Sequence, residues 1–155
     1  MHPVRLCWDC VVWDLDGTLT VPGLARAAPG VRGVLDAWAE RGTPMAVATS
    51  ASTPVARRLV ADLGWTGLFG HVAGTAPGVG DKEAVVVEAL LGLGRPLPDG
   101  AVGAVLIGDS PGDVRAARAH DLDAVGVAWG AAEADALRAA GASWVAVDPD
   151  ELRPS

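Results

Sequence analysis

The sequence predicts a Rossmann-like α/β fold with three layers, in which a parallel sheet lies between two layers of helices. Short apolar segments alternate along the chain with segments of helical periodicity, as strands and helices do in βαβ units. The apolar segments are continuous rather than alternating with polar residues, which is typical of strands buried on both faces. Glycines follow several of the helical segments, where a left-handed cap is expected.

The first half of the chain is expected to contain three strands and two helices. The apolar runs that predict strands are Cys10–Trp13, Pro44–Ala48 and His71–Ala73. The segments with a helical pattern are Val31–Arg41 and Thr53–Leu63, and the glycines at their cap positions are Gly42 and Gly64. One helix therefore separates each strand from the next, as the crossover between parallel strands requires.

The second half continues the same alternation. The segments with a helical pattern are Lys82–Leu91, Gly112–His120 and Ala132–Ala140, and the apolar runs are Ala104–Ile107, Ala124–Val127 and Trp144–Val147. Gly92 and Gly141 follow two of these helices, and Pro111 falls in the first turn of another, where a missing N–H costs little. Because no linker, repeat or low-complexity segment interrupts the pattern, we expect one core domain over residues 1–155.

The composition indicates a globular chain and excludes several classes of partner. Of the 155 residues, 50% are hydrophobic and 20% are charged, which is typical of a folded domain. The net charge is −7 and no basic cluster is longer than Arg57-Arg58, so a nucleic-acid partner is not expected. No apolar stretch has the length of a membrane span or the character of an export signal, which predicts a cytoplasmic protein without a membrane partner.

The cysteines and the single lysine are the other notable features of the composition. Cys7 and Cys10 are three residues apart, a spacing that points two side chains of a strand to opposite faces. We therefore expect no shared metal and no disulfide, but one core thiol and one thiol near the surface. Lys82 is the one lysine beside eleven arginines, which suggests a position that needs a compact ammonium group.

Side chains suited to binding ions follow four of the predicted strands. Carboxylates follow the first strand and the fourth, hydroxyls follow the second, and a lysine at a helix start follows the third. In chain order these residues are Asp14 and Asp16, Thr49 and Ser50, Lys82, and Asp109 and Asp113. The carboxyl ends of the strands form the ligand crevice of such a sheet. Acids crowded there repel one another unless a cation or a shared proton compensates, which predicts a metal site beside an anion site.

In this order the motifs resemble those of phosphatases of the haloacid dehalogenase superfamily. Asp14-Leu-Asp16-Gly-Thr-Leu resembles the first motif, Thr49 the second, Lys82 the third, and Gly108-Asp109-Ser-Pro-Gly-Asp113 the fourth. The segment Ala28-Pro-Gly-Val-Arg-Gly-Val-Leu is similar to phosphoglycolate-phosphatase-like members. The resemblance extends over almost the whole chain. It implies a Mg²⁺-dependent phosphomonoester hydrolase that acts through an aspartyl-phosphate intermediate.

The resemblance also implies a role for each acid. Asp14 would be the nucleophile, and Asp16 would be the general acid for the leaving alcohol and then the general base for water. The Mg²⁺ ion would be held by the carboxylate of Asp14, the backbone carbonyl of Asp16 and the carboxylate of Asp109. Asp113 would support this shell of ligands.

The phosphate-binding residues follow in the same way, with some alternatives. Thr49 and the backbone N–H of Ser50 would bind the phosphoryl oxygens, and Lys82 would offset the negative charge of the phosphate and the nucleophile. Many relatives have a proline after this lysine, whereas Glu83 follows here and could pair with Lys82. Thr49 and Ser50 could instead cap the next helix, and Asp109 could likewise be a helix N-cap.

The gaps between the motifs leave no room for the lid domain that many relatives insert. Between the first two motifs the only irregular segment is the loop Thr20–Gly30. We therefore expect an open site, whose specificity comes from short loops or from a neighbouring subunit in a homo-oligomer. An open site accepts a larger phospho-substrate as well as a phosphorylated small molecule, and it argues against phosphoglycolate itself.

The tryptophans are expected to have two kinds of position. Trp13 and Trp38 are expected in the core, whereas Trp129 follows a strand end and is a candidate to stack on the substrate.

Two alternative functions remain beside the phosphatase. A phosphotransferase or phosphomutase would use the same aspartyl-phosphate, but that chemistry usually requires the exclusion of water. A non-catalytic phosphate-binding regulatory domain is the other alternative.

Overall fold

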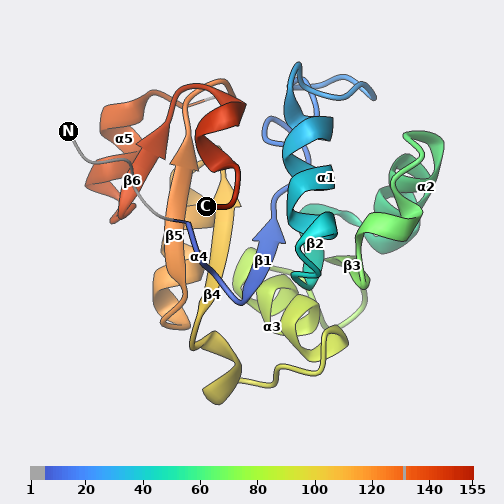
Figure 1. Cartoon of the computed structure of the whole chain (residues 1–155). Helices are drawn as coiled ribbons and strands as arrows, with labels where there is room; N and C mark the ends of the chain where they lie inside the picture. Colours follow the sequence, from blue (N-terminus) through green and yellow to red (C-terminus); the bar gives the residue numbers. More distant parts are fainter. Residues whose placement is uncertain (1–5, 131) are drawn as a thin grey trace.

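A computed structural model of the chain describes residues 6–130 and 132–155. Its strands form one six-stranded parallel sheet (Figure 1). The strands are β1 (Cys10–Trp13), β2 (Met45–Ser52), β3 (His71–Thr75), β4 (Ala104–Gly108), β5 (Asp123–Val127) and β6 (Trp144–Ala146). The helices are α1 (Val31–Glu40), α2 (Thr53–Asp62), α3 (Lys82–Gly92), α4 (Pro111–Ala119) and α5 (Ala134–Ala139). Every predicted strand and helix is present, with ends that differ by a few residues.

Helices cover both faces of the sheet, so the predicted three layers are confirmed. One core contains the apolar sides of α1 and α2 and the alternate strand residues Val11, Trp13, Val47 and Ile107. The other core contains the apolar sides of α3, α4 and α5 and the intervening strand residues, among them Val12, Ala46, Ala48 and Leu106. This division follows from the period of two along a strand, which sends neighbouring side chains to opposite faces.

The order of the strands, β3-β2-β1-β4-β5-β6, places β1 between β2 and β4. The chain leaves β1 toward β2 and β3 on one side and later returns to β4 on the other side. The sheet therefore has its topological switch point at β1, where ligands bind outside the carboxyl ends of the strands. Trp13 pairs with Val47 and with Ile107, so the residues that follow these three positions lie at one edge of the sheet.

Two details of the predicted elements are wrong. The prediction that β2 ends at Ala48 is wrong, because the strand continues to Ser52 with a shift of its register against β3. The predicted cap at Gly92 is also wrong, because this glycine is the last residue of α3 and Gly94 takes the left-handed conformation. A Cβ atom at Gly92 would lie 2.2 Å from the ring of His71, so the close approach of α3 to β3 requires the glycine.

The segment between β1 and α1 is a loop with short bridges and contains no lid domain. As predicted, Cys10 is buried on β1 and Cys7 is exposed, and both are free thiols in this structure. Trp13 and Trp38 are fully buried in the core, also as predicted. Within the described ranges, no helix combines the length and the apolar character needed to cross a membrane.

Candidate active site

Three acids from two neighbouring strand ends meet at the switch point of the sheet. Asp14 directly follows β1, Asp109 directly follows β4, and Asp113 lies in the first turn of α4. One carboxylate oxygen of each acid lies within 4.8 Å of the others, and all three side chains are buried. The backbone N–H of Asp14 donates to the carbonyl of Ile107 at 2.9 Å, which joins the end of β1 to the end of β4.

Lys82 is the cation of this acid cluster. It is the first residue of α3, and its Nζ atom lies 2.8 Å from Oδ1 of Asp14 and 2.9 Å from Oδ1 of Asp113. Its third hydrogen bond goes to the backbone carbonyl of Ala48, at 2.6 Å. Three acceptors therefore surround the three donors of the ammonium, so the pairing with Glu83 that the sequence allowed is not formed.

Burial and charge move the pKa values of the two central groups. Burial raises the pKa of Asp14 well above its usual value, and Asp113 and Asp109 raise it further, whereas Lys82 opposes the shift. Burial acts against the charge of Lys82, but the two carboxylates outweigh it, so the pKa of Lys82 is also raised. Three acids facing one ammonium leave an excess of negative charge, which favours either a retained proton or a bound cation.

Thr18 is a site residue that the sequence reasoning missed. Its buried hydroxyl lies 3.3 Å from Oδ2 of Asp14 and 3.2 Å from Oδ1 of Asp109, so it bridges the two acids. Its backbone carbonyl accepts a hydrogen bond of 2.9 Å from the indole of Trp129. The signal was present in the sequence, because Thr18 lies within the first motif, but a single threonine after a glycine has no particular meaning without the fold.

Glycines surround the acids closely. A Cβ atom on Gly17, whose φ angle is 79°, would lie 2.2 Å from Oδ2 of Asp109, and one on Gly130 would lie 2.4 Å from the Cβ atom of Asp109. A Cβ atom on Gly108 would lie 2.4 Å from Oδ2 of Asp113. Side chains at these three positions would therefore displace the carboxylates, so the glycines are part of the geometry of the site.

Asp16 lies beside the acid cluster rather than in it. Its side chain is exposed and lines the pocket, and its Oδ1 atom accepts a hydrogen bond of 2.9 Å from the backbone N–H of Gly23. This bond connects the end of the first motif to the loop before α1. An exposed carboxylate at the mouth of the pocket can exchange protons with a ligand and with water, which the buried acids cannot do as easily.

The alternative roles as helix caps are wrong for all three residues concerned. Ser52 is the N-cap of α2, so Thr49 and Ser50 do not cap that helix. Ser110 is the N-cap of α4 and forms a capping box with Asp113, so Asp109 does not cap that helix. Thr49 is buried with its hydroxyl 3.2 Å from the N–H of Ala51, and both Thr49 and Ser50 line the pocket.

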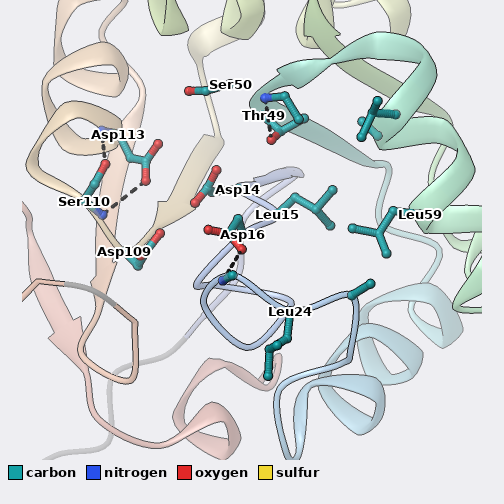
Figure 2. A pocket seen from close by; sticks show the side chains of 15 residues that line it. Asp14, Leu15, Asp16, Leu24, Thr49, Ser50, Leu59, Asp109, Ser110 and Asp113 are labelled. Carbon is teal, nitrogen blue, oxygen red and sulfur yellow. Dashed lines mark hydrogen bonds between the residues drawn. The ribbon is translucent and has the colours of Figure 1, made fainter.

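The acids lie in an open pocket of about 660 Å³. Figure 2 shows Asp109 and Asp113 on one side of the pocket, Leu15 and Leu59 on the other, and Asp14 between them. A volume of this size accepts a phosphate group together with a larger substituent.

Trp129 does not line this pocket, so the expectation that it stacks on a substrate there is wrong. It lies on a neighbouring cavity of about 570 Å³, formed by the loop before α1 and by residues near the end of the chain. Its indole N–H is used by the carbonyl of Thr18. Trp129 therefore holds the backbone of the first motif in place at Thr18.

Comparison with known proteins identifies related sequences and structures. The family model described as haloacid dehalogenase-like hydrolase matches residues 21–118 and so begins after the first two acids. The tyrosine-protein kinase PtkA of Mycobacterium tuberculosis (strain ATCC 25618 / H37Rv) is 42% identical over 91 residues, which are 57% of this chain and 30% of PtkA. The chain thus spans less than a third of the length of the curated relatives it matches.

Solved structures with the same fold include a predicted phosphatase from Clostridium acetobutylicum, with a TM-score of 0.83 at 20% identity over 94% of this chain and 96% of that chain. A putative beta-phosphoglucomutase from Thermotoga maritima has a TM-score of 0.74 at 19% identity, over 93% and 96% of the two chains. A putative phosphoglycolate phosphatase from Lactobacillus delbrueckii subsp. bulgaricus has a TM-score of 0.73 at 26% identity, over 81% of this chain and 52% of that chain.

Proposed function

Because the chain belongs to the haloacid dehalogenase-like hydrolase family, we propose that it hydrolyses phosphate monoesters with Asp14 as the nucleophile. The observation that carries this proposal is the position of Asp14 at the floor of the pocket. Lys82 and Thr18 contact its two carboxylate oxygens, and two further acids lie beside it. A carboxylate held in this way is oriented before a substrate arrives, which is the main requirement of phosphoryl transfer.

The donor set of the acid cluster fits a divalent cation. Its carboxylate oxygens come from Asp14, Asp109 and Asp113, and hard cations such as Mg²⁺ prefer oxygen ligands. The three carboxylates and the single ammonium of Lys82 carry a net charge of about −2 when all are ionised, which one divalent ion would neutralise. When bound, Mg²⁺ would stabilise the negative charge that the transferred phosphoryl group spreads over its oxygens. In our proposal Asp14, Asp109 and the backbone carbonyl of Asp16 hold it, and Asp113 supports them.

In the first step the carboxylate of Asp14 attacks phosphorus. A bond forms between a carboxylate oxygen and phosphorus, and the bond between phosphorus and the ester oxygen breaks. Asp16 supplies the proton that the leaving oxygen needs, since its carboxyl group lies at the mouth of the pocket. The raised pKa of Lys82 keeps its ammonium charged, so it offsets the charge of the phosphate next to Asp14.

In the second step water replaces Asp14 on phosphorus. Asp16, now ionised, takes a proton from the water, whose oxygen bonds to phosphorus while the bond to Asp14 breaks. Inorganic phosphate leaves, and both acids return to their initial states. Thr49 and the N–H of Ser50 are the proposed ligands of the phosphoryl oxygens, because both residues line the pocket beside Asp14.

The test is hydrolysis of p-nitrophenyl phosphate with Mg²⁺ by the wild-type protein and by Asp14→Asn. We expect the variant to lose the activity almost completely, since an amide is a poor nucleophile. Asp81→Asn is the matched control, because Asp81 lies next to Lys82 in sequence and only caps α3. Equal rates for the wild type and Asp14→Asn would reject the proposal. Binding of beryllofluoride without turnover would instead favour a regulatory phosphate-binding domain.

A second candidate function is phosphoryl transfer to an acceptor other than water. The similarity to a protein named a tyrosine-protein kinase favours it. The same aspartyl-phosphate would then be attacked by an acceptor hydroxyl, and that proton would go to Asp16. Release of inorganic phosphate from p-nitrophenyl phosphate, measured with and without a tyrosine-containing peptide, separates the two functions. A phosphatase releases the same amount in both cases, whereas a transferase releases less when the peptide becomes labelled.

A further inference from the structure

One wall of the active-site pocket is apolar and accessible. Leu15, Leu24, Val55 and Leu59 line it, and we call these four residues the apolar wall. Leu15 is only 2% exposed, so Leu24, Val55 and Leu59 supply the accessible surface of the wall. Leu24 is 49% exposed and Val55 is 60% exposed, so both offer apolar surface inside the pocket. Accessible apolar groups that gather in a pocket indicate contact with an apolar part of a ligand.

The wall comes from two separate parts of the chain. Leu15 and Leu24 belong to the first motif and to the loop that follows it, whereas Val55 and Leu59 lie one turn apart on α2. In Figure 2 the side chains of Leu15 and Leu59 lie on the side of Asp14 that is opposite to Asp109 and Asp113. A phosphate group placed on Asp14 would therefore have the acids on one side and its ester substituent near the wall.

The charges that line the pocket disfavour a second negative group on the substrate. Among the residues described, the charged side chains that line the pocket are those of Asp14, Asp16, Asp109 and Asp113, and no arginine or lysine lines it. A carboxylate on the leaving group would meet the exposed carboxylate of Asp16 there, and Lys82, the cation of the acid cluster, already contacts Asp14, Asp113 and the carbonyl of Ala48, so the carboxylate would be repelled. The nearest arginine along the loop, Arg26, is exposed and does not line the pocket.

We infer that the substrate is a phosphate monoester whose leaving group is uncharged, apolar and of aromatic size. This inference rests on the proposed phosphatase function and concerns the specificity of the same site. Leu24, Val55 and Leu59 are the specificity-determining residues, because they offer the accessible apolar surface of the wall. A free aryl or arylalkyl phosphate and a phosphotyrosyl side chain of a peptide share this chemistry.

The experiment compares three esters of similar alcohols: ethyl phosphate, benzyl phosphate and phosphoglycolate. Relative to ethyl phosphate, benzyl phosphate adds apolar area and phosphoglycolate adds a carboxylate. We expect kcat/KM to be about tenfold higher for benzyl than for ethyl phosphate, because burial of roughly 55 Å² of ring surface suffices for that factor. We expect kcat/KM for phosphoglycolate to be lower than for ethyl phosphate. Equal or faster hydrolysis of phosphoglycolate than of benzyl phosphate would overturn the inference.

Variants test whether the wall is responsible. Val55→Ser should reduce the benzyl-to-ethyl ratio of kcat/KM by about three- to fivefold, since a hydroxyl replaces apolar contact at an open rim. Val102→Ser is the matched control, because Val102 is an exposed valine near the opposite ends of the strands, and it should leave the ratio unchanged. A ratio that Val55→Ser leaves unchanged would contradict the assignment. A preference for phosphoglycolate that disappears in Arg26→Ala would replace it with a cation site.

Binding keeps this inference distinguishable from the proposed function. With Mg²⁺ present, benzylphosphonate should bind about tenfold more tightly than ethylphosphonate, and neither compound is an ester that can be hydrolysed. Lack of turnover of every ester would reject the phosphatase, whereas equal affinities for the two phosphonates would reject the apolar leaving group. Phenyl phosphate and a phosphotyrosyl peptide then identify the source. Faster hydrolysis of the peptide assigns the leaving group to a protein side chain, and the reverse result assigns it to a small molecule.

Discussion

Asp14→Asn should make the metal-free protein more stable while it removes the activity. Asp14 is 7% exposed and shares its surroundings with the carboxylates of Asp109 and Asp113. Asparagine has nearly the same shape, its carbonyl oxygen can still accept the hydrogen bond from Lys82, and its amide can donate to Asp109. The substitution therefore removes a buried charge with little change in packing or hydrogen bonding.

The size of the effect follows from the distances. At an effective dielectric constant of about 20, carboxylates up to 4.8 Å apart repel by at least roughly 3.5 kcal/mol per pair. The ammonium of Lys82, at 2.8 Å, attracts Asp14 by roughly 6 kcal/mol on the same scale. The two repulsions about cancel the attraction, and the remaining term is the loss of hydration, which amounts to several kcal/mol for a buried ion. Since relaxation reduces that term, we expect a gain of about 2 kcal/mol in the free energy of unfolding.

The gain should depend on pH with a defined sign. Because the pKa of Asp14 is raised in the folded protein above its ordinary value of 3.8, protonation of this group favours the folded state. That contribution is complete below pH 3.8 and is lost as the pH rises through the folded pKa. The asparagine variant has no such loss, so its advantage over the wild type should be larger at pH 8 than at pH 5.

Thermal and urea unfolding in EDTA measure this advantage. For a chain of this length, about 2 kcal/mol corresponds to a rise of roughly 4 to 8 °C in the unfolding temperature. Addition of Mg²⁺ should then stabilise the wild type more than the variant and reduce the difference. A variant that is less stable than the wild type in EDTA at pH 8 would refute the reasoning. The attraction between Lys82 and Asp14 would then outweigh both the repulsion from the other two acids and the loss of hydration.

Four further predictions concern single residues. Mg²⁺ should raise the unfolding temperature of the wild type, and Asp109→Asn should lose most of that rise, as a thermal titration would show. Lys82→Ala should lose more phosphatase activity than Lys82→Arg, and both should lose most of it; near wild-type turnover by Lys82→Ala would contradict its assigned role. Gly130→Ala should cost about 1 to 3 kcal/mol in the free energy of unfolding because of its clash with Asp109, and Gly67→Ala, which has open space, is its control. Ser110→Ala should cost about 1 kcal/mol because the capping box of α4 is lost, and an unchanged urea midpoint would argue against that cap.

The layered architecture could be predicted from the sequence because strands and helices leave local signals. The apolar run Cys10–Trp13 predicts a buried strand, and its bounds agree with those of β1. The acids after β1 and β4 could be expected to meet, because parallel strands bring their carboxyl ends to one edge of the sheet. Those signals depend on periodicity and on order along the chain, which are properties of the sequence.

Contacts between distant residues could not be predicted in this way. Thr18 lies within the first motif, but the sequence does not indicate that its hydroxyl joins Asp14 to Asp109, since Asp109 is 91 residues away. The glycine of α3 that was expected to cap the helix is instead required by the ring of His71, a residue on β3. The apolar wall likewise combines the first loop with one side of α2.

The sequence by itself therefore determined the order of the strands and helices, the burial of the sheet and the set of charged residues at its edge. The tertiary structure decided which groups contact Asp14, which glycines are needed for close packing, and which side chains surround the pocket. The physical reason is that hydrophobic periodicity acts within one element, whereas hydrogen bonds, charge and exclusion of neighbouring atoms act across space. Distances of a few ångströms between elements, which set these interactions, exist only once the chain has folded.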